Sequence, residues 1–215
     1  MKYFCFVNSL FFSIFLTAQQ KVVKKSELIS SVLEIKTDGV DHLIIQENES
    51  NLLELTIFNA DELRITQIIH CDDDRCLLNI QVNSNIDHPL NNKINQFSIA
   101  PPNNVTIIIK IPKNKIVRLF SDMIDVETNG YAGNLYILIN RGNIRITELK
   151  GITEIYLFAG TVVASVNKQS IDIHSTKGHI LMNTQIQKSP YRKNANKKDK
   201  LYIKSIHANV ILTGQ

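Results

Sequence analysis

Two cysteines and a short acidic run form the most compact set of reactive side chains in this sequence. Cys71 and Cys76 bracket the segment 72–75, which reads Asp-Asp-Asp-Arg, and apolar residues alternate with polar ones on both sides of it. This pattern predicts a β-hairpin whose acidic tip sets the two cysteines opposite each other, where they can form a disulfide. A calcium site on the aspartates is the alternative, but calcium needs six or more oxygen ligands and the DxDxDG spacing is missing. A solvated turn is favoured.

Histidines and carboxylates near residue 175 raise the question of a metal or acid–base site. His174 and His179 lie five residues apart, with Asp172 beside them. The alternation of the chain places Asp172 and His174 on one outward face, without an indicated pocket, so plain surface is the preferred interpretation. Glu148 and Glu154 complete the nearby acidic residues and are not expected to converge with Asp172. No catalytic, cofactor-binding or metal-binding residue is therefore predicted.

Basic residues offer a third kind of chemistry, the binding of anions. The segment 188–200 reads KSPYRKNANKKDK and forms the centre of an insertion that we place at 187–200. It could hold an anionic polysaccharide, a lipopolysaccharide phosphate or nucleic acid by charge, with nucleic acid the weakest case, although a solvated loop is the simpler interpretation. The candidate anion-binding residues are Arg192, Lys193, Lys197 and Lys198 in the insertion, with Arg141, Lys150, Lys168 and Lys177 at the ninth position of a repeat.

That repeat has a period of nine residues between Gly133 and Ile186. Glycine opens five of the six units, the third position is apolar in five units, and the fifth position is apolar in all six. Such alternation turns one row of side chains inward, and glycine supplies the positive φ that a tight turn needs. A fixed short period indicates stacked β-units that bury their apolar rows against one another. The fifth positions, expected to form one or two inward ladders, are Ile137, Ile146, Ile155, Ala164, Ile173 and Met182.

The chain before the repeats alternates between short apolar runs and turn signals, which predicts strands rather than alternating strands and helices. A weak helical pattern occurs only at 25–32, and the polar segment 85–95 is expected to be a surface loop. The expected strands are 32–36, 42–46, 52–58, 63–69, 76–83, 97–99, 105–111 and 117–120, with 201–206 and 210–212 following the insertion.

The first residues have the features of a secretory signal peptide. Lys2 precedes an apolar run from Phe4 to Leu16, and cleavage is expected after Ala18. Export removes Cys5 and leaves Cys71 and Cys76 as an even pair in an oxidising compartment. The net charge of +4 says little about partners. We expect an exported protein, located in the periplasm, at the outer surface or in the medium, with no integral membrane segment after cleavage.

The passage 104–166 resembles the DUF4097 family of bacterial "putative adhesins". The resemblance is carried by a strand that ends at Ile111-Pro112-Lys113, by the run 117–120, and by repeated units of glycine followed by alternating apolar residues. It covers roughly residues 33–182, whereas Gln169 in place of glycine and the basic insertion depart from it. The resemblance implies an exported, Bacteroidetes-like protein with a repetitive β-fold, often drawn as a β-solenoid, and offers no catalytic residues to transfer.

Together these observations predict an all-β protein: a glycine-punctuated, repetitive β-solenoid or β-helix-like stack preceded by an antiparallel β-region. The expected divisions are a signal peptide at 1–18, an N-terminal β-region with a hairpin at 19–112, and a repetitive region at 113–215. The first functional hypothesis is a non-catalytic, adhesin-like or structural protein of the cell envelope, without a cofactor, which binds an anionic polysaccharide or another surface component. The second is a carbohydrate-active enzyme of the parallel β-helix type acting on an acidic polysaccharide, which would need paired carboxylates in a groove.

Overall fold

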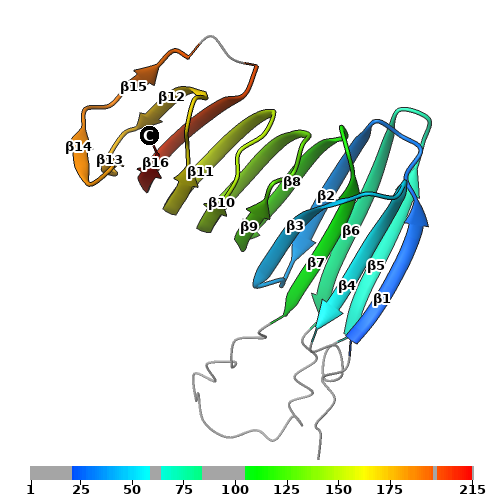
Figure 1. Cartoon of the computed structure of the whole chain (residues 1–215). Coiled ribbons are helices and arrows are strands. Elements are labelled where there is room, and N and C mark those ends of the chain that lie inside the picture. Colours follow the sequence, from blue (N-terminus) through cyan, green and yellow to red (C-terminus); the bar gives the residue numbers. More distant parts are fainter. Residues whose placement is uncertain (1–20, 59–63, 84–104, 196–197, 215) are drawn as a thin grey trace, which may run out of the picture.

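The computed structural model describes residues 21–58, 64–83, 105–195 and 198–214, and these form one large open sheet with no helix (Figure 1). No element of the described residues could therefore cross a membrane as a helix. The first eight strands are β1 (Lys21–Glu27), β2 (Val32–Asp38), β3 (His42–Asn48), β4 (Leu52–Phe58), β5 (Arg64–Cys71), β6 (Arg75–Asn83), β7 (Thr106–Pro112) and β8 (Ile116–Met123). The others are β9 (Asp125–Asn129), β10 (Asn134–Ile146), β11 (Ile152–Ser165), β12 (Ser170–Ser175), β13 (Ile180–Met182), β14 (Gln185–Gln187), β15 (Tyr191–Lys193) and β16 (Lys200–Thr213). The expected strand 97–99 and loop 85–95 lie outside the described residues.

The hydrogen-bonded pairs arrange the strands in two rows that share three long strands. The first row runs β5, β6, β2, β8, β10, β11, β16, β12 and β15. The second row runs β1, β4, β7, β3, β9, then the later halves of β10, β11 and β16, and ends with β13 and β14. Because β10, β11 and β16 bend from one row into the other, the two rows are parts of a single sheet.

In the middle of the molecule, neighbouring parallel strands are related by a constant step along the sequence. Val117 pairs with Leu135, and Leu135 pairs with Thr153, so each step is 18 residues, or two of the nine-residue units. One unit is therefore half of a long strand rather than a strand of its own. The expected fifth-position residues fall into two inward ladders, one per row, and five of the six are buried, with Met182 half-buried.

The bends in β10 and β11 fall on glycines that open repeat units. Gly142 has a φ of 147° and Gly160 a φ of 143°, inside strands rather than at tight turns. A Cβ on Gly160 would overlap the carbonyl oxygen of Gly142, and a Cβ on Gly142 would overlap that of Ile124. Glycine is required at these positions because successive strands approach each other closely at the bend.

The C-terminal strand breaks the regular step. The repeat would pair Ile155 with Ile173, again 18 residues apart, but both residues pair with Ile203 of β16 instead. In the second row, β16 likewise lies between β11 and β13, where Val210 pairs with Val162 and Ile180. The last strand in the sequence is thus inserted between strands that the nine-residue repeat would place side by side.

The N-terminal region joins the same sheet, with both parallel and antiparallel pairs. β2 pairs in parallel with β8, and β3 pairs in parallel with β7 and β9, so hydrogen bonds cross the expected division at residue 112. β5 and β6 form the expected antiparallel hairpin. The helical expectation for 25–32 is wrong, because Lys21–Glu27 forms β1, an exposed strand that pairs antiparallel with β4. The β-branched pair Val22-Val23 and the free edge of β4 outweigh a weak helical period.

Side chains that alternate inward from both rows make one hydrophobic core. Leu33, Ile35 and Leu43 from the early strands belong to the same buried cluster as Ile155 and Ile203. Each of these side chains is fully buried, which identifies the space between the two rows as the core. The side chains of opposite alternation point outward, and it is among these that a binding surface must be sought.

Candidate functional site

Four aromatic side chains form a continuous row across the outer surface of the first row of strands. Phe120 of β8 lies 6.0 Å from Tyr136 of β10, measured between ring centroids. Tyr136 lies 5.3 Å from Tyr156 of β11, which lies 5.8 Å from Tyr202 of β16. The rings are tilted by 40–52° to their neighbours, an arrangement that aromatic pairs favour. We call these four residues the aromatic row.

An open groove of about 800 Å³ lies at the β16 end of the aromatic row. Tyr156 and Tyr202 form part of its lining, together with the carboxylates of Glu154 and Asp172. Lys200 contributes from the start of β16, and Asn194 contributes from the insertion. The groove therefore combines two aromatic rings with charged and amide groups, which is the usual chemistry of a ligand site.

Register places the polar residues of the groove around the two tyrosines. Tyr202 stands between Glu154 of β11 and Asp172 of β12, and Lys204 stands next to Tyr156. The β16 side chains lie between those of β11 and β12 because the strand itself is inserted there. The groove thus depends on three segments that are far apart in the sequence.

Tyr156 is partly shielded from water and lies close to the carboxylate of Glu154. Loss of water contact raises the pKa of its phenol above the ordinary value of 10. The carboxylate of Glu154 raises that pKa further, as do the neighbouring phenols of Tyr202 and Tyr136. At neutral pH the ring is therefore an uncharged surface that can stack and whose hydroxyl can donate a hydrogen bond.

The sequence-based expectation that the carboxylates of the repeats do not converge is wrong for one pair. Glu154 and Asp172 line the same groove, separated by Tyr202. Asp172, however, accepts a hydrogen bond from Nε of Arg192 at 3.1 Å, so its charge is already balanced. The third carboxylate, Glu148, pairs with Lys150 at 3.1 Å and does not line the groove.

The described parts of the insertion, 187–195 and 198–200, are more ordered than a solvated loop. Tyr191–Lys193 forms β15 and pairs antiparallel with β12, in register with Ile171–Ile173. Asp199 accepts a hydrogen bond from the amide of Gly151 at 2.9 Å, and its own carbonyl accepts one from Ser170. The loop expectation fails here because the edge of β12 offers unpaired backbone groups, which a three-residue strand satisfies.

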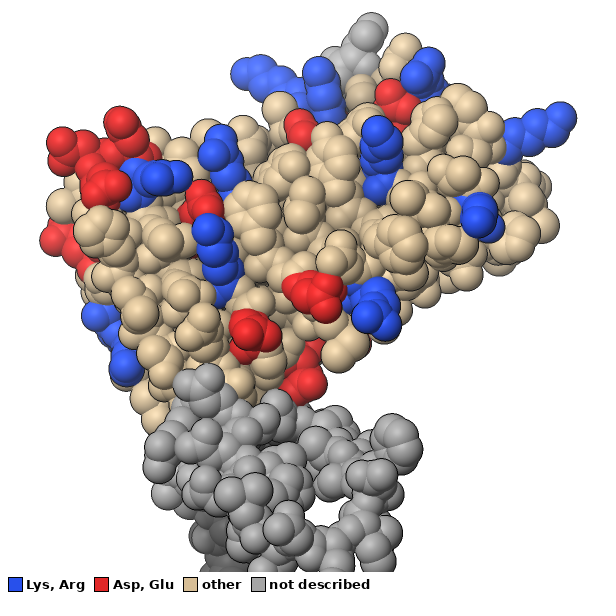
Figure 2. All heavy atoms as spheres, turned by 180° about the vertical axis from the view of Figure 1, so that it is seen from behind, with Lys and Arg blue, Asp and Glu red and all other residues tan. Residues whose placement is uncertain are grey.

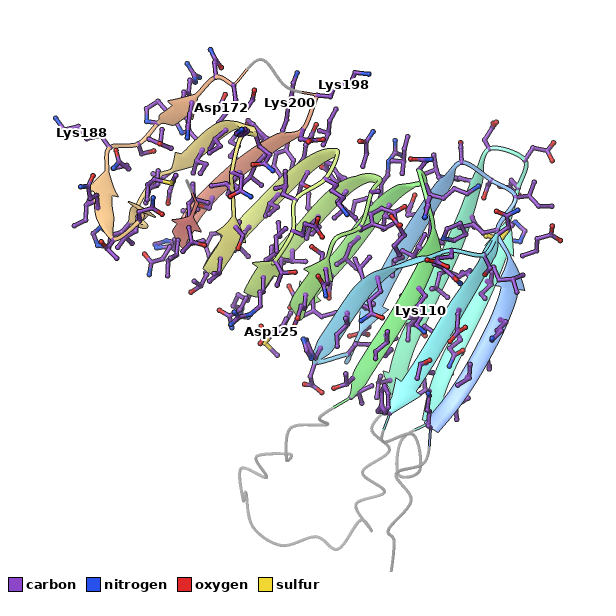
Figure 3. The ribbon with its side chains drawn as sticks, in the orientation of Figure 1. Lys110, Asp125, Asp172, Lys188, Lys198 and Lys200 are labelled. Atoms are coloured by element: carbon purple, nitrogen blue, oxygen red, sulfur yellow. A yellow bond between two sulfur atoms is a disulfide. The ribbon has the colours of Figure 1, made fainter. Side chains whose placement is uncertain are left out.

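The predicted anion-binding residues occupy three separate parts of the fold. Arg192, Lys193 and Lys198 lie at the insertion, whereas Lys197 lies outside the described residues. Arg141 lies at the bend of β10 and Lys177 follows β12, while Lys150 and Lys168 lie in the connections before β11 and β12. In Figure 2 basic side chains gather at the insertion end and are otherwise interspersed with acidic ones. Figure 3 shows Lys188, Lys198 and Lys200 at the insertion end of the sheet, with Lys188 on the other side of Asp172 from Lys198 and Lys200.

The two remaining sequence candidates have simple surroundings. Cys71 and Cys76 are opposite each other in the β5–β6 hairpin and are joined in a disulfide, with Cα atoms 4.0 Å apart. The tip is closed by a hydrogen bond from the amide of Asp72 to the carbonyl of Arg75. His174 and His179 are both exposed. Within the described parts of the chain, no group of three or more His, Cys, Asp or Glu residues is arranged to hold a metal ion.

Several residues of the site were not identified from the sequence. Tyr136 and Tyr156 were recognisable as outward side chains in the repeats, but Phe120, Tyr202 and Lys204 lie outside the repeat segment. Their alternation within their own strands shows that they point outward, so that signal was present. Alternation does not reveal the order of the strands in the sheet, and that order decides whether outward residues become neighbours.

Comparison with known proteins identifies the fold and no family. No protein-family model matches the chain, and no curated protein is significantly similar to it. A solved structure named "putative cell adhesion protein", from Clostridium sporogenes, is similar with a TM-score of 0.65 and 13% identity, covering 92% of this chain and all of that one. A "putative adhesin" from Bacteroides fragilis has a TM-score of 0.32 and 12% identity over 92% of this chain and 98% of that one. The first of these similarities shows that this open all-β fold occurs in another bacterial protein.

Proposed function

We propose that this chain is an exported, non-catalytic, adhesin-like protein that binds an acidic polysaccharide along the aromatic row and the groove at its end. The observation that carries the proposal is the run of four aromatic side chains across β8, β10, β11 and β16. Its resemblance to the DUF4097 adhesins and the name of the similar Clostridium protein support the same class. In this proposal the 18-residue steps make the fold a flattened β-solenoid with one outer face used for binding.

The aromatic row suits an extended sugar polymer. Four neighbouring strands place the ends of the row about 14 Å apart at the usual spacing of a sheet. Sugar rings stack their CH groups on aromatic faces, and the tyrosine hydroxyls can donate hydrogen bonds to ring substituents. A row of rings at nearly constant spacing can engage successive units of one chain, so that weak contacts add up.

The charges around the aromatic row favour an acidic polymer over a neutral one. Among the described residues, Arg118, Lys200 and Lys204 are exposed and make no ion pair. Arg118 stands beside Tyr136 in register, and Lys204 stands beside Tyr156. In the described part of the chain, these three cations outnumber the carboxylates near the row that make no ion pair, which are Glu154 beside the tyrosines and Asp122 near Phe120. The surface therefore has a net attraction for anions. Arg118, Lys200 and Lys204 are therefore the proposed anion contacts, in place of the scattered basic residues that the sequence suggested.

A polysaccharide-cleaving enzyme is the second candidate, favoured by the presence of Glu154 and Asp172 in one groove. An inverting glycosidase holds two carboxylates on either side of the scissile bond, with one acting as acid and the other as base. Binding without cleavage is preferred here because Arg192 already engages Asp172. Release of reducing ends from acidic polysaccharides by the wild-type chain, abolished in Glu154→Gln, would support the enzyme instead.

The binding proposal is tested by affinity electrophoresis through gels containing alginate, polygalacturonate or hyaluronan, with dextran as the neutral polymer. We expect retardation by at least one acidic polymer, and weaker retardation as salt screens the lysines. The double variant Tyr156→Ala/Tyr202→Ala should weaken binding by about tenfold or more, equivalent to about 1.4 kcal/mol. Tyr156→Phe/Tyr202→Phe should keep most of the binding because the rings remain.

Arg145→Ala is the matched control for Lys204→Ala. Arg145 is an exposed cation on β10, but it belongs to the second row of strands and points away from the aromatic row. Lys204→Ala should reduce retardation, whereas Arg145→Ala should not. Retardation by dextran equal to that by the acidic polymers, or equal effects of both cation variants, would contradict the proposal.

A further inference from the structure

The place of β16 in the sheet can be filled without changing the register of its neighbours. Ile155 of β11 and Ile173 of β12 pair with the same residue, Ile203, and Ala164 and Met182 pair with the same residue, Leu212. β11 and β12 are therefore already in the 18-residue register that would allow them to pair directly. Removing β16 leaves two strands that match each other, and replacing it requires only a strand with the same sequence.

β16 is bound to the rest of the sheet by hydrogen bonds along both of its edges and by buried side chains on one face. It pairs in parallel with β11 along nearly its whole length, and with β12 and β13 on its other side. Its inward side chains Leu201, Ile203 and Val210 are at most 1% exposed.

The segment before β16 is long enough to reach another molecule. Twelve residues separate the end of β14 at Gln187 from the start of β16 at Lys200. Fully extended, they span about 40 Å. In its described part this segment is held by three register pairs of β15 with β12 and by the exposed Arg192–Asp172 ion pair. Hydrogen bonds also join Ser189 and Ala195 to β12, and Asp199 to Gly151 and Ser170. The exposed ion pair adds about 1 kcal/mol or less. Asp199 directly precedes β16, so its hydrogen bonds to Gly151 and Ser170 can form again on the copy that receives the strand.

From this geometry we propose that β16 of one copy can occupy the place between β11 and β12 of a second copy, which links copies of the chain by strand exchange. The exchanged strand makes the same hydrogen bonds and buries the same side chains as in the single chain, so the two forms differ mainly in the entropy of association. Exchange should therefore increase with protein concentration during folding. Each exchanged copy would present its own aromatic row, but the inference does not depend on what that row binds.

The test uses single-cysteine variants of the full chain, with the Cys71–Cys76 pair retained. Thr161 of β11 and Asn209 of β16 are register partners on the outer surface. A Thr161→Cys chain and an Asn209→Cys chain are unfolded together, refolded at increasing concentration and oxidised. Strand exchange predicts a disulfide-linked dimer of one chain of each kind, whose yield rises with concentration, identified by mass.

Two controls make the result decisive. The double variant Thr161→Cys/Asn209→Cys should form the bond within one chain, which shows that the geometry permits it. A mixture of Asn143→Cys and Thr161→Cys chains should form no such dimer above background, because Asn143 lies on β10 and is not carried by the exchanged strand. Failure of the Thr161–Asn209 mixture to give dimer at any concentration, while the double variant bonds internally, would overturn the proposal.

Discussion

The step from β10 to β11 and the step from β11 to β12 cover the same 18 residues of sequence but differ by a whole strand in space. β10 and β11 pair directly, with Ile137 opposite Ile155. β11 and β12 are separated by β16, which pairs with both. The comparison teaches that the repeat determines the register of each strand, whereas the C-terminal segment determines which strands are neighbours.

The inserted strand also makes the difference between a plain surface and a candidate site. Direct pairing of β11 with β12 would place the carboxylates of Glu154 and Asp172 on adjacent strands, where like charges repel. Insertion of β16 places Tyr202 between them and adds Lys200 and Lys204 to the same surface. The groove exists only on the interrupted step.

The largest loss of stability is expected from a substitution in the inward ladder of the first row, which takes part in both steps. Ile155 is fully buried and pairs with Ile137 on one side and Ile203 on the other. Ile155→Asp would bury an unpaired charge and should cost several kcal/mol, enough to prevent folding. Circular dichroism and urea unfolding would measure this, with Thr161→Asp on the outer surface as the control. A folded Ile155→Asp chain with an unchanged melting temperature would contradict the inward ladder.

Substitutions at the bends of β11 and β16 should have the next largest effect on stability. They also distinguish the direct step from β10 to β11 from the step interrupted by β16. Gly160 has no room for a Cβ beside the carbonyl of Gly142, so Gly160→Ala should lose about 2 kcal/mol or more in urea unfolding. Ala208 takes the equivalent place on β16 and pairs with Gly160 in register, although it carries a Cβ. Ala208→Gly should therefore cost only about 1 kcal/mol. Equal costs at both positions would contradict a different packing of the inserted strand.

A smaller effect is expected where β16 enters the sheet. The Asp199 carboxylate accepts a hydrogen bond from the Gly151 amide at 2.9 Å, just before β16 begins. Asp199→Ala should lower the free energy of unfolding by about 1 kcal/mol, because one hydrogen bond to a charged acceptor is lost. Asp73→Ala at the exposed hairpin tip is the control and should have almost no effect.

The smallest effect is expected in the antiparallel part of the second row, away from both steps. A hydrogen bond from Lys25 and the charges of Lys25, Lys110 and Lys21 hold the pKa of Glu54 below its ordinary value of 4.5. A lowered folded-state pKa adds stability that is present above 4.5 and is lost as the pH falls through the folded value. Glu54→Gln should therefore be slightly less stable than the wild type at neutral pH and equally stable in stronger acid. A difference that persists below that range would contradict the assignment to ionisation.

The parts of the fold that could be predicted from the sequence are those set by local alternation. The strand predicted at 52–58 has the bounds of β4, and the cysteines at 71 and 76 lie opposite each other in a hairpin. The expected strands 201–206 and 210–212 are two halves of β16, which continues through Ala208. Period and alternation depend on neighbouring residues, so they can be recognised in a single sequence.

What could not be predicted depends on contacts between distant segments. Tyr202 lies 46 residues after Tyr156, yet it is the next ring of the aromatic row. Nothing in the local pattern of β16 distinguishes an inserted strand from one added at the edge of the sheet. Tyr136 and Tyr156 were recognisable as outward rings, but the complete aromatic row was not predicted, since its residues become neighbours only through strand order.

Disulfide trapping of strand neighbours tests the insertion of β16 most directly. Thr161 lies on β11, Asn209 lies opposite it on β16, and His179 lies just before β13, all with outward side chains. The amide of His179 donates a hydrogen bond to Oδ1 of Asn209 at 2.9 Å. The double-cysteine variants Thr161→Cys/Asn209→Cys and Asn209→Cys/His179→Cys should form internal disulfides rapidly. Thr161→Cys/His179→Cys should not, because two strand spacings, about 10 Å, separate its residues. Rapid bonding of the 161–179 pair together with failure of the 161–209 pair would show that β11 pairs directly with its successor and that β16 lies elsewhere.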